Sequence, residues 1–138
     1  MPGSLTLRVI TPEAIVLDQS VESAVVPATD GLTGILPRHA PMVVALDAGV
    51  LKCVAAGREQ RLFVAGGFAE VQSDTVRVIT QASERPTDID VERAQRAAER
   101  ARERLHAGEA APGEELDVLR AEAALRRALQ RLRTAEHG

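Results

Sequence analysis

Apolar and polar positions alternate through the first part of the chain. In residues 5–11, Leu5, Leu7 and Val9 fall on one face of an extended segment, the period-two pattern of a half-buried strand. Paired glycines at residues 66–67 interrupt a later segment of this kind and indicate a bulge or a sharp bend. The same pattern predicts further strands over residues 14–18, 21–26, 42–46, 50–56, 60–65, 68–72 and 75–80. Short strands separated by regular turns predict an all-β sandwich or barrel.

The stretch over residues 28–51 concentrates glycines and prolines around a short loop. Pro37 and Pro41 bound this loop and restrict its backbone at both ends. Arg38 and His39 lie between them, where a stiff loop would present their side chains in fixed directions. The loop is therefore either a surface for a partner or an ordinary crossover between strands, and the spacing alone leaves both open.

The pattern changes at Pro86, where β-branched residues give way to Ala, Glu and Arg. Residues 87–90 offer capping side chains and first-turn acids, which favour the start of a helix. A connector over residues 106–113 and a second helix over residues 114–135 complete the chain. We therefore predict an α+β fold, with an antiparallel β-sandwich or barrel at residues 1–86 and a two-helix antiparallel hairpin at residues 87–138.

Small apolar residues dominate the facing stripes of the two predicted helices. The first stripe consists of Val91, Ala94, Ala98, Ala101 and Leu105. The second consists of Val118, Ala121, Leu125, Ala128 and Leu132, widened by Leu116, Leu119 and Leu129. Burial contributes only ~25 cal/mol per Å² of apolar area, whereas ordering a residue costs about 1–2 kcal/mol. We expect an alanine-rich hairpin to need support from the β domain, a partner or a ligand, and to change its docking.

Composition narrows the possible functions. The 138 residues are 45% hydrophobic and 27% charged, and the net charge is -3. Two Phe and no Trp or Tyr leave no aromatic platform for stacking nucleic-acid bases. No apolar run approaches the ~20 residues that span a bilayer, and the start of the chain lacks the pattern of a signal peptide. We expect a cytoplasm-facing protein that binds no nucleic acid and reaches a membrane only through partners.

Candidate catalytic groups are sparse. Cys53 is the single cysteine, and no basic residue lies beside it on its face of the strand, so we expect a small core residue rather than a reactive thiol. The histidines at positions 39, 106 and 137 lack the spacing of metal ligands. We predict neither a catalytic site nor a metal site.

Arginines of the helical part have two interpretations. One set lies beside glutamates at four-residue spacing, as on any solvated helix: Arg96, Arg100 and Arg104. Arg127 and Arg131 instead share a face one turn apart and would converge with Arg93 at the seam between the helices, near Asp90. Converging guanidinium groups suit a phosphate, so this second set is a candidate phosphate site.

Three stretches resemble one known family. Residues 31–41, GLTGILPRHAP, are similar to a glycine, isoleucine, leucine, proline, histidine, alanine, proline pattern, and residues 64–71, VAGGFAEV, to a Gly-Gly-Phe-x-Glu-Val strand. Residues 87–138 resemble the helical hairpin that follows these motifs in the epsilon subunit of bacterial rotary, proton-translocating ATP synthases. The resemblance covers nearly the whole chain. It implies a sandwich of about ten short strands followed by the hairpin.

The resemblance also implies partners. In that family the sandwich binds the central-stalk gamma subunit and the membrane-embedded c ring, at the cytoplasmic face of the bacterial plasma membrane. By position, Asp30, Arg38 and His39 fall where the family faces the c ring. Two positions depart from the common pattern, since Arg38 stands where glycine is usual and Thr33 where an apolar residue is common. A positive φ at Arg38 would be costly.

ATP-sensing bacterial members of the family carry a motif of Ile or Leu, Asp, two variable residues, Arg and Ala. The matching residues here are Ile89, Asp90, Arg93 and Ala94, and three more positions match: Glu84, Arg127 and Arg131. The resemblance implies ATP as a regulatory ligand, with the arginines at the phosphates and the other residues on the adenine side. No other cofactor is implied.

The resemblance therefore implies a non-catalytic rotor subunit that couples proton flow to ATP synthesis. Its hairpin would restrain ATP hydrolysis by extending into the alpha/beta catalytic head, and ATP would favour the folded hairpin through its differential affinity for that state. Two other classes are an arginine-rich helical adaptor for nucleic acid and a small enzyme. Net acidity and the lack of aromatic residues weigh against the first, and the second has no candidate residues.

Overall fold

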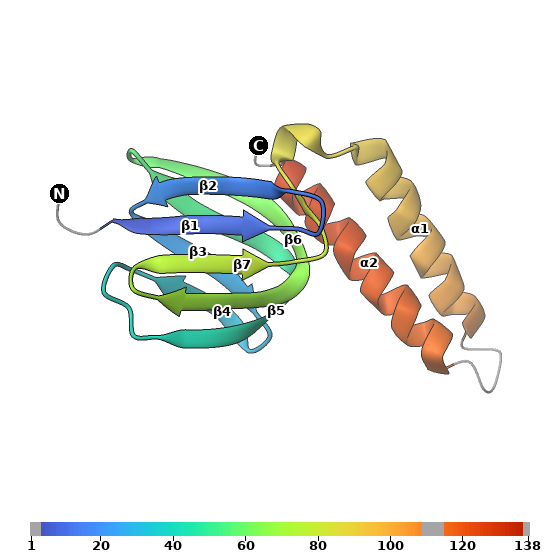
Figure 1. Cartoon of the computed structure of the whole chain (residues 1–138). Coiled ribbons are helices and arrows are strands. Elements are labelled where there is room, and N and C mark those ends of the chain that lie inside the picture. Colours follow the sequence, from blue (N-terminus) through green and yellow to red (C-terminus); the bar gives the residue numbers. More distant parts are fainter. Residues whose placement is uncertain (1–3, 109–114, 137–138) are drawn as a thin grey trace.

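The computed structural model describes residues 4–108 and 115–136 and shows a β-sandwich followed by a helical hairpin (Figure 1). The strands are β1 (Leu5–Ile10), β2 (Ile15–Val21), β3 (Ser23–Ala28), β4 (Gly31–Ile35), β5 (Met42–Ala55), β6 (Arg58–Gln72), β7 (Thr75–Ile79) and β8 (Ser83–Glu84). The 3-10 helix η1 (Pro86–Asp88) leads to the helices α1 (Val91–Gly108) and α2 (Glu115–Glu136). The predicted α+β class is confirmed, and most of the predicted connector, residues 109–113, lies outside the described residues.

Strand pairing gives the order β2-β1-β7-β6-β5-β3-β4, and β8 pairs with β6. One pair departs from the expected antiparallel pattern, because β1 and β7 run parallel. Parallel neighbours need a long connection, and here every strand from β2 to β6 lies between them in sequence. The sequence pattern shows each strand but not this pairing.

Two long strands replace four short strands of the prediction. β5 and β6 pair along almost their whole length, and both bend where the register skips one residue on each strand, at Asp47 and Gly66. Gly66 and Gly67 adopt φ values of 97° and 105°, which only glycine adopts at little cost. A Cβ atom on Gly67 would lie 1.9 Å from the carbonyl oxygen of Ile79. The irregularity predicted from the paired glycines is confirmed, but it bends the strand instead of ending it.

This bend reverses which residues of β6 face the core. Val64 before the bend and Ala69 after it both belong to the core, although they differ in parity. Phe63 and Phe68 consequently lie on the outer face of the sandwich, on either side of the bend. Both phenylalanines of the chain therefore lie outside the core of the sandwich.

The core itself is aliphatic. It comprises Leu5, Leu7, Val9, Leu17, Val21, Ala24, Val26, Ile35, Leu46, Leu51, Cys53, Leu62, Val64, Ala69, Val71, Val76 and Val78. Cys53 is a free, buried thiol, as expected for a small core residue. Burial raises the pKa of this thiol, and a hydrogen bond from Gln19 lowers it by less.

The hairpin forms two further layers. α2 packs on β5 and β6, and α1 packs mainly on the opposite side of α2 (Figure 1). The seam is as alanine-rich as predicted, with Ala94, Ala98, Ala101, Ala121 and Ala128 all buried. Leu119 and Leu129 do not widen it as expected, because they are 62% and 38% exposed. The side chain of Leu116 lies outside the described residues.

Candidate functional site

The outer face of the sandwich carries a row of apolar side chains that no described element covers. Register places one member on each successive strand of β2-β1-β7-β6-β5: Ile15, Ile10, Ile79, Phe68 and Ala45. The exposed fractions of Ile15, Phe68 and Ile79 are 60%, 58% and 50%. We refer to these five residues as the apolar row. Contiguous exposed apolar surface of this kind marks a protein interface.

Sequence reasoning missed the apolar row. Ile10 and Ile79 do stand at alternation positions that are normally polar on a half-buried strand, which is a weak signal. They become neighbours only through the parallel pairing of β1 with β7, in which Ile10 lies opposite Ile79. No local pattern contains that pairing.

A second apolar part of the outer face is covered by α2. Phe63 of β6 is fully buried, and its cross-strand partner Val50 is 9% exposed. Neither residue belongs to the core between the sheets. α2 therefore closes over one apolar patch of the sandwich and leaves the apolar row free.

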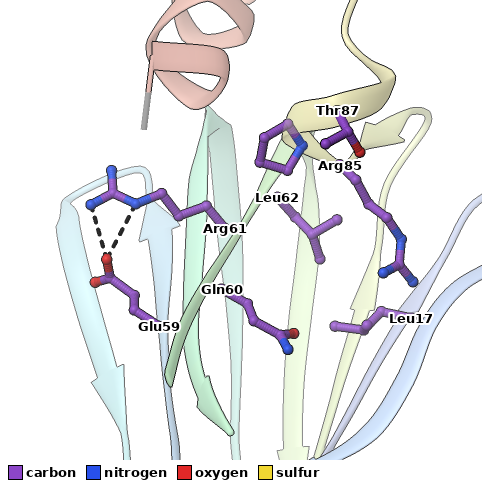
Figure 2. A pocket seen from close by; sticks show the side chains of 8 residues that line it. Leu17, Glu59, Gln60, Arg61, Leu62, Arg85 and Thr87 are labelled. Carbon is purple, nitrogen blue, oxygen red and sulfur yellow. Dashed lines mark hydrogen bonds and ion pairs between the residues drawn. The ribbon is translucent and has the colours of Figure 1, made fainter. Parts of the chain in front are cut away.

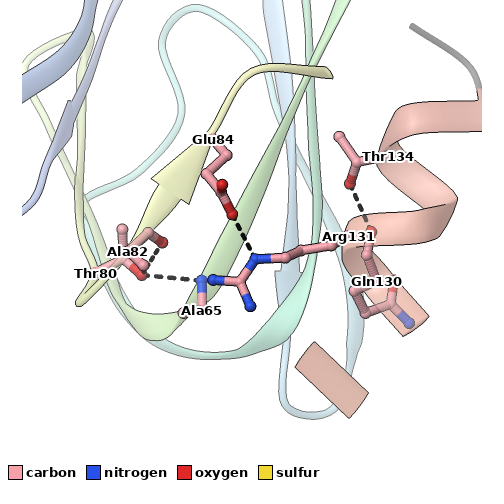
Figure 3. Close-up of polar contacts among 7 residues, drawn as sticks. All are labelled: Ala65, Thr80, Ala82, Glu84, Gln130, Arg131 and Thr134. Atoms are coloured by element: carbon pink, nitrogen blue, oxygen red, sulfur yellow. Dashed lines mark hydrogen bonds and ion pairs between the residues drawn. The ribbon is translucent and has the colours of Figure 1, made fainter. Parts of the chain in front are cut away.

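Arg131 fastens α2 to the sheet beside this covered patch, and Figure 3 shows its ion pair with Glu84. Its Nε donates a hydrogen bond to Oε1 of Glu84 on β8, and its guanidinium carbon lies 4.4 Å from the ring centroid of Phe63. One turn further along α2, the buried Thr134 hydroxyl donates to the carbonyl oxygen of Gln130 at 2.7 Å. An ion pair combined with a cation–π contact ties the helix to the sheet through a single side chain. Glu84 and Arg131, both predicted site residues, thus lie in direct contact.

The other residues predicted to bind ATP do not share the contact between Glu84 and Arg131. Asp90 caps α1, because its Oδ1 accepts from the backbone N–H of Arg93 at 3.0 Å. Ile89 and Ala94 are buried, and the Arg93 side chain is exposed. Within residues 4–108 and 115–136, the guanidinium groups of Arg93 and Arg127 make no ion pair. Of the three arginines predicted to converge, Arg131 is paired with Glu84, and their convergence on a phosphate stays a prediction.

The loop after β4 holds Arg38 in a left-handed backbone conformation. Arg38 has a φ of 67°, and its backbone N–H donates to Oδ1 of Asp74 at 2.7 Å. The N–H of His39 donates to the carbonyl oxygen of Leu36 at 3.1 Å, which closes the turn. The loop is therefore tied to the β6–β7 turn, and the costly φ foreseen for Arg38 is present.

Asp30 lies at the other end of β4 from this loop. β4 has five residues, so its ends are separated by about 13 Å at the usual rise of a strand. Leu32 and Leu36 are exposed between them. The structure does not bring Asp30 together with Arg38 and His39, but it joins them along one edge of the sheet, since β4 is the last strand in the order.

A cavity of about 300 Å³ opens where the segment before α1 crosses the sandwich (Figure 2). Its lining includes Arg61 and Arg85, but both arginines have protein partners. Arg61 pairs with Glu59 at 3.0 Å, and Arg85 donates to the carbonyl oxygen of Val16 at 3.0 Å. We interpret this cavity as a packing gap at the junction.

Neither metal ligation nor membrane insertion is indicated in the part of the chain that the structure describes. Its His, Cys, Asp and Glu side chains form no group of three or more that would hold a metal ion. Neither of the two described helices is long and apolar enough to cross a membrane.

Comparison with known families covers both parts of the chain. Residues 4–86 match the β-sandwich domain of the ATP synthase delta/epsilon chain, and residues 87–136 match its long α-helix domain. The ATP synthase epsilon chain of Carboxydothermus hydrogenoformans is 47% identical over 105 residues, 76% of this chain and 78% of that protein. The epsilon chain of Moorella thermoacetica is 48% identical over 112 residues, 80% of this chain and 82% of that one.

Solved structures show the same fold. A chain of the Euglena gracilis mitochondrial ATP synthase, solved as OSCP/F1/c-ring, superposes with a TM-score of 0.81 at 24% identity, covering 99% of this chain and 84% of that one. A chain of the central stalk and c-ring of the Tetrahymena thermophila mitochondrial ATP synthase superposes with a TM-score of 0.63 at 11% identity, covering 95% of this chain and 96% of that one.

Proposed function

The chain belongs to the ATP synthase delta/epsilon family, and we propose that it works as the epsilon chain of a bacterial F-type ATP synthase. It is a non-catalytic subunit that turns with the central stalk and regulates the enzyme. The observation that carries this proposal is the match of both successive domains, combined with identity near one half to bacterial epsilon chains. As a subunit of this complex it would lie at the cytoplasmic face of the plasma membrane, held there by its partners.

The apolar row is our candidate contact with the gamma subunit. Its exposed side chains span neighbouring strands of a rigid sheet, so binding would cost little ordering of the epsilon chain. A central-stalk partner that covers the row would remove three large apolar side chains from water. Co-purification of the full chain with its own gamma subunit tests this assignment.

The edge formed by β4 is our candidate contact with the c ring. It carries Asp30 at one end, Arg38 and His39 at the other, and exposed leucines between them. A ring of identical subunits presents repeated loops, which suits an elongated edge better than a single pocket. Loss of coupling after charge reversal at Asp30, with gamma binding retained, would support this part of the proposal.

The hairpin is our candidate brake on ATP hydrolysis. α1 rests mainly on α2 through an alanine seam, and α2 rests on the sandwich through Phe63, Val50 and Arg131. A hairpin held by so few large contacts can leave the sandwich and extend towards the alpha/beta head. The test is reconstitution of the complex with the chain cut after Pro86. We expect normal assembly and faster hydrolysis, and unchanged hydrolysis would overturn the inhibitory role.

ATP is our candidate ligand for the docked hairpin, with Glu84, Ile89, Asp90, Arg93, Ala94, Arg127 and Arg131 as the proposed set. Since Arg131 is paired with Glu84, a phosphate must compete with that carboxylate for the guanidinium group. Titration with ATP, followed by amide NMR, tests the site directly. Saturable shifts in α1 and α2 that Arg127→Ala and Arg131→Ala abolish would support it, and their absence in the unmodified chain would remove ATP from the proposal.

A further inference from the structure

A basic cavity lies between α2 and the sandwich, on a face of α2 that the proposed nucleotide residues do not use. It measures about 380 Å³ and is lined by small and apolar residues of β3, β4 and β5, Leu32 and Val50 among them, together with charged groups from both domains. The basic members are Lys52, Arg61, Arg126 and Arg133. Among the described residues that line it, Asp47 is the only one with a carboxylate.

The sheet contributes two of these cations side by side. Lys52 of β5 and Arg61 of β6 are direct cross-strand partners, and like charges in such a position repel. Glu59 neutralises Arg61 at 3.0 Å. Lys52, the only lysine of the chain, makes no ion pair with any described carboxylate. Its ammonium group is therefore free to meet an anion from the cavity.

The helix contributes the other wall. Arg126, Gln130 and Arg133 follow one another at spacings of four and three, so they share one face of α2. Arg126 reaches Asp47 at 3.6 Å, through a pair that is largely exposed. Arg133 has no ion-pair partner among the described residues and stands in the last turn of the helix.

The floor between these walls is open backbone. Ala28, Ala48 and Gly49 leave little side chain there. A Cβ atom on Gly49 would lie 2.6 Å from Cβ of Pro27, so the position is held small by packing on the neighbouring strand. Cationic groups on two walls over a small-residue floor suit a compact anion with several oxygens.

We propose that this cavity binds a diphosphate group, either as free pyrophosphate or as part of a nucleotide, and that the bound anion bridges Lys52 of the sandwich to Arg133 of α2. The site exists only while α2 lies on β5, so the anion stabilises the docked hairpin through its differential affinity for that state. It is separate from the proposed ATP set, because that set uses Arg127 and Arg131 on the adjacent face of the helix.

The test is calorimetric titration of the full chain with inorganic pyrophosphate at low ionic strength. Lys52→Gln and Arg133→Gln should each weaken binding roughly tenfold, as expected for loss of one charge-assisted contact. Asp47→Asn should strengthen binding, because it removes the carboxylate that competes for Arg126. Arg104→Gln, an exposed arginine on α1, is the matched control and should leave the affinity unchanged. Circular dichroism of each variant confirms that the hairpin is folded.

Two further measurements separate the sources of the anion and the sites. Protection of α2 amides from hydrogen exchange should rise with pyrophosphate and fail to rise in Lys52→Gln. A parallel titration with ADP tests whether the bound diphosphate belongs to a nucleotide. If Lys52→Gln weakens ADP binding, a nucleotide is a source of the anion. If ADP binding is unchanged in this variant, free pyrophosphate is the source. Absence of pyrophosphate binding, or binding lost in Arg127→Ala but kept in Lys52→Gln, would overturn the proposal without affecting the assignment of the chain as an epsilon subunit.

Discussion

Arg38 occupies a backbone conformation that suits glycine. Its φ of 67° lies in the left-handed region, which costs a non-glycine residue about 1–2 kcal/mol. The hydrogen bond from its N–H to Asp74 holds the conformation and survives any change of side chain. We expect Arg38→Gly to raise the free energy of unfolding by about 1 kcal/mol, measured by urea denaturation. Ala40→Gly in the same loop is the control and should be neutral or slightly destabilising, because φ is not positive there.

Cys53 makes the stability of the folded chain depend on pH in the alkaline range. Burial raises the pKa of its thiol in the folded state, so the unfolded chain loses this proton at a lower pH than the folded chain. The contribution is complete below the unfolded pKa and is lost as the pH rises through the folded value. Cys53→Ala lacks this term. We expect the difference in Tm between wild type and variant to shrink from pH 8 to pH 10, measured by differential scanning calorimetry. This range brackets the pKa of about 8.5 that a cysteine thiol has in an unfolded chain. A constant difference would contradict it.

At the scale of the element, the hairpin is organised around alanine. Ala98 is buried in the seam between α1 and α2, where a larger side chain would separate the helices. We expect Ala98→Leu to destabilise hairpin docking by about 1–3 kcal/mol, because overpacking forces backbone shifts. Ala107→Leu, an exposed site of the same helix, should have little effect. Hydrogen exchange of α1 amides distinguishes the two, and the amides of β1 and β7 should stay protected in both variants.

Arg131 makes one of the two ion pairs that join α2 to the sheet among the described residues, the other being Arg126 with Asp47. Arg131 pairs with Glu84 and covers the Phe63 ring, so its side chain joins a charge contact to an apolar one. We expect Glu84→Gln to weaken ATP binding severalfold, because the change removes the carboxylate of a residue in the proposed ATP set. Amide NMR titration of the variant against wild type measures the change. Stronger binding would instead show that Glu84 only competes with a phosphate for Arg131 and would remove it from the set.

At the scale of the whole molecule, the outer face of the sandwich divides into a covered and a free apolar surface. The bend in β6 puts Phe63 under α2 and Phe68 in the apolar row. We expect Phe68→Ser to weaken gamma binding by about 1.5–3 kcal/mol, the value of burying such a side chain, while changing the Tm little because the residue is exposed. Leu119→Ser, equally exposed but on α2, should leave gamma binding intact. Surface plasmon resonance on immobilised gamma compares them.

Most of the elements followed from the sequence alone. Period-two alternation located most of the strands but not β4 or β8, and the change in composition at Pro86 separated the strands from the helices. The alanine stripes predicted a narrow seam, and Ala94, Ala98 and Ala101 form it. The glycine pair correctly predicted a bend, but β5 and β6 are each continuous where two shorter strands were expected. Glycine signals an irregular backbone, but whether pairing continues depends on the neighbouring strand.

What the sequence determined by itself is therefore local: most of the strands, the two helices and the buried thiol of Cys53. Those properties depend on side-chain periodicity and on backbone sterics, which act over a few residues. Only the tertiary structure decided that Ile10 meets Ile79, that Arg131 meets Glu84 and Phe63, and that Lys52 faces Arg133 across a cavity. These contacts join residues far apart in sequence, and register and docking, which no local pattern encodes, bring them together.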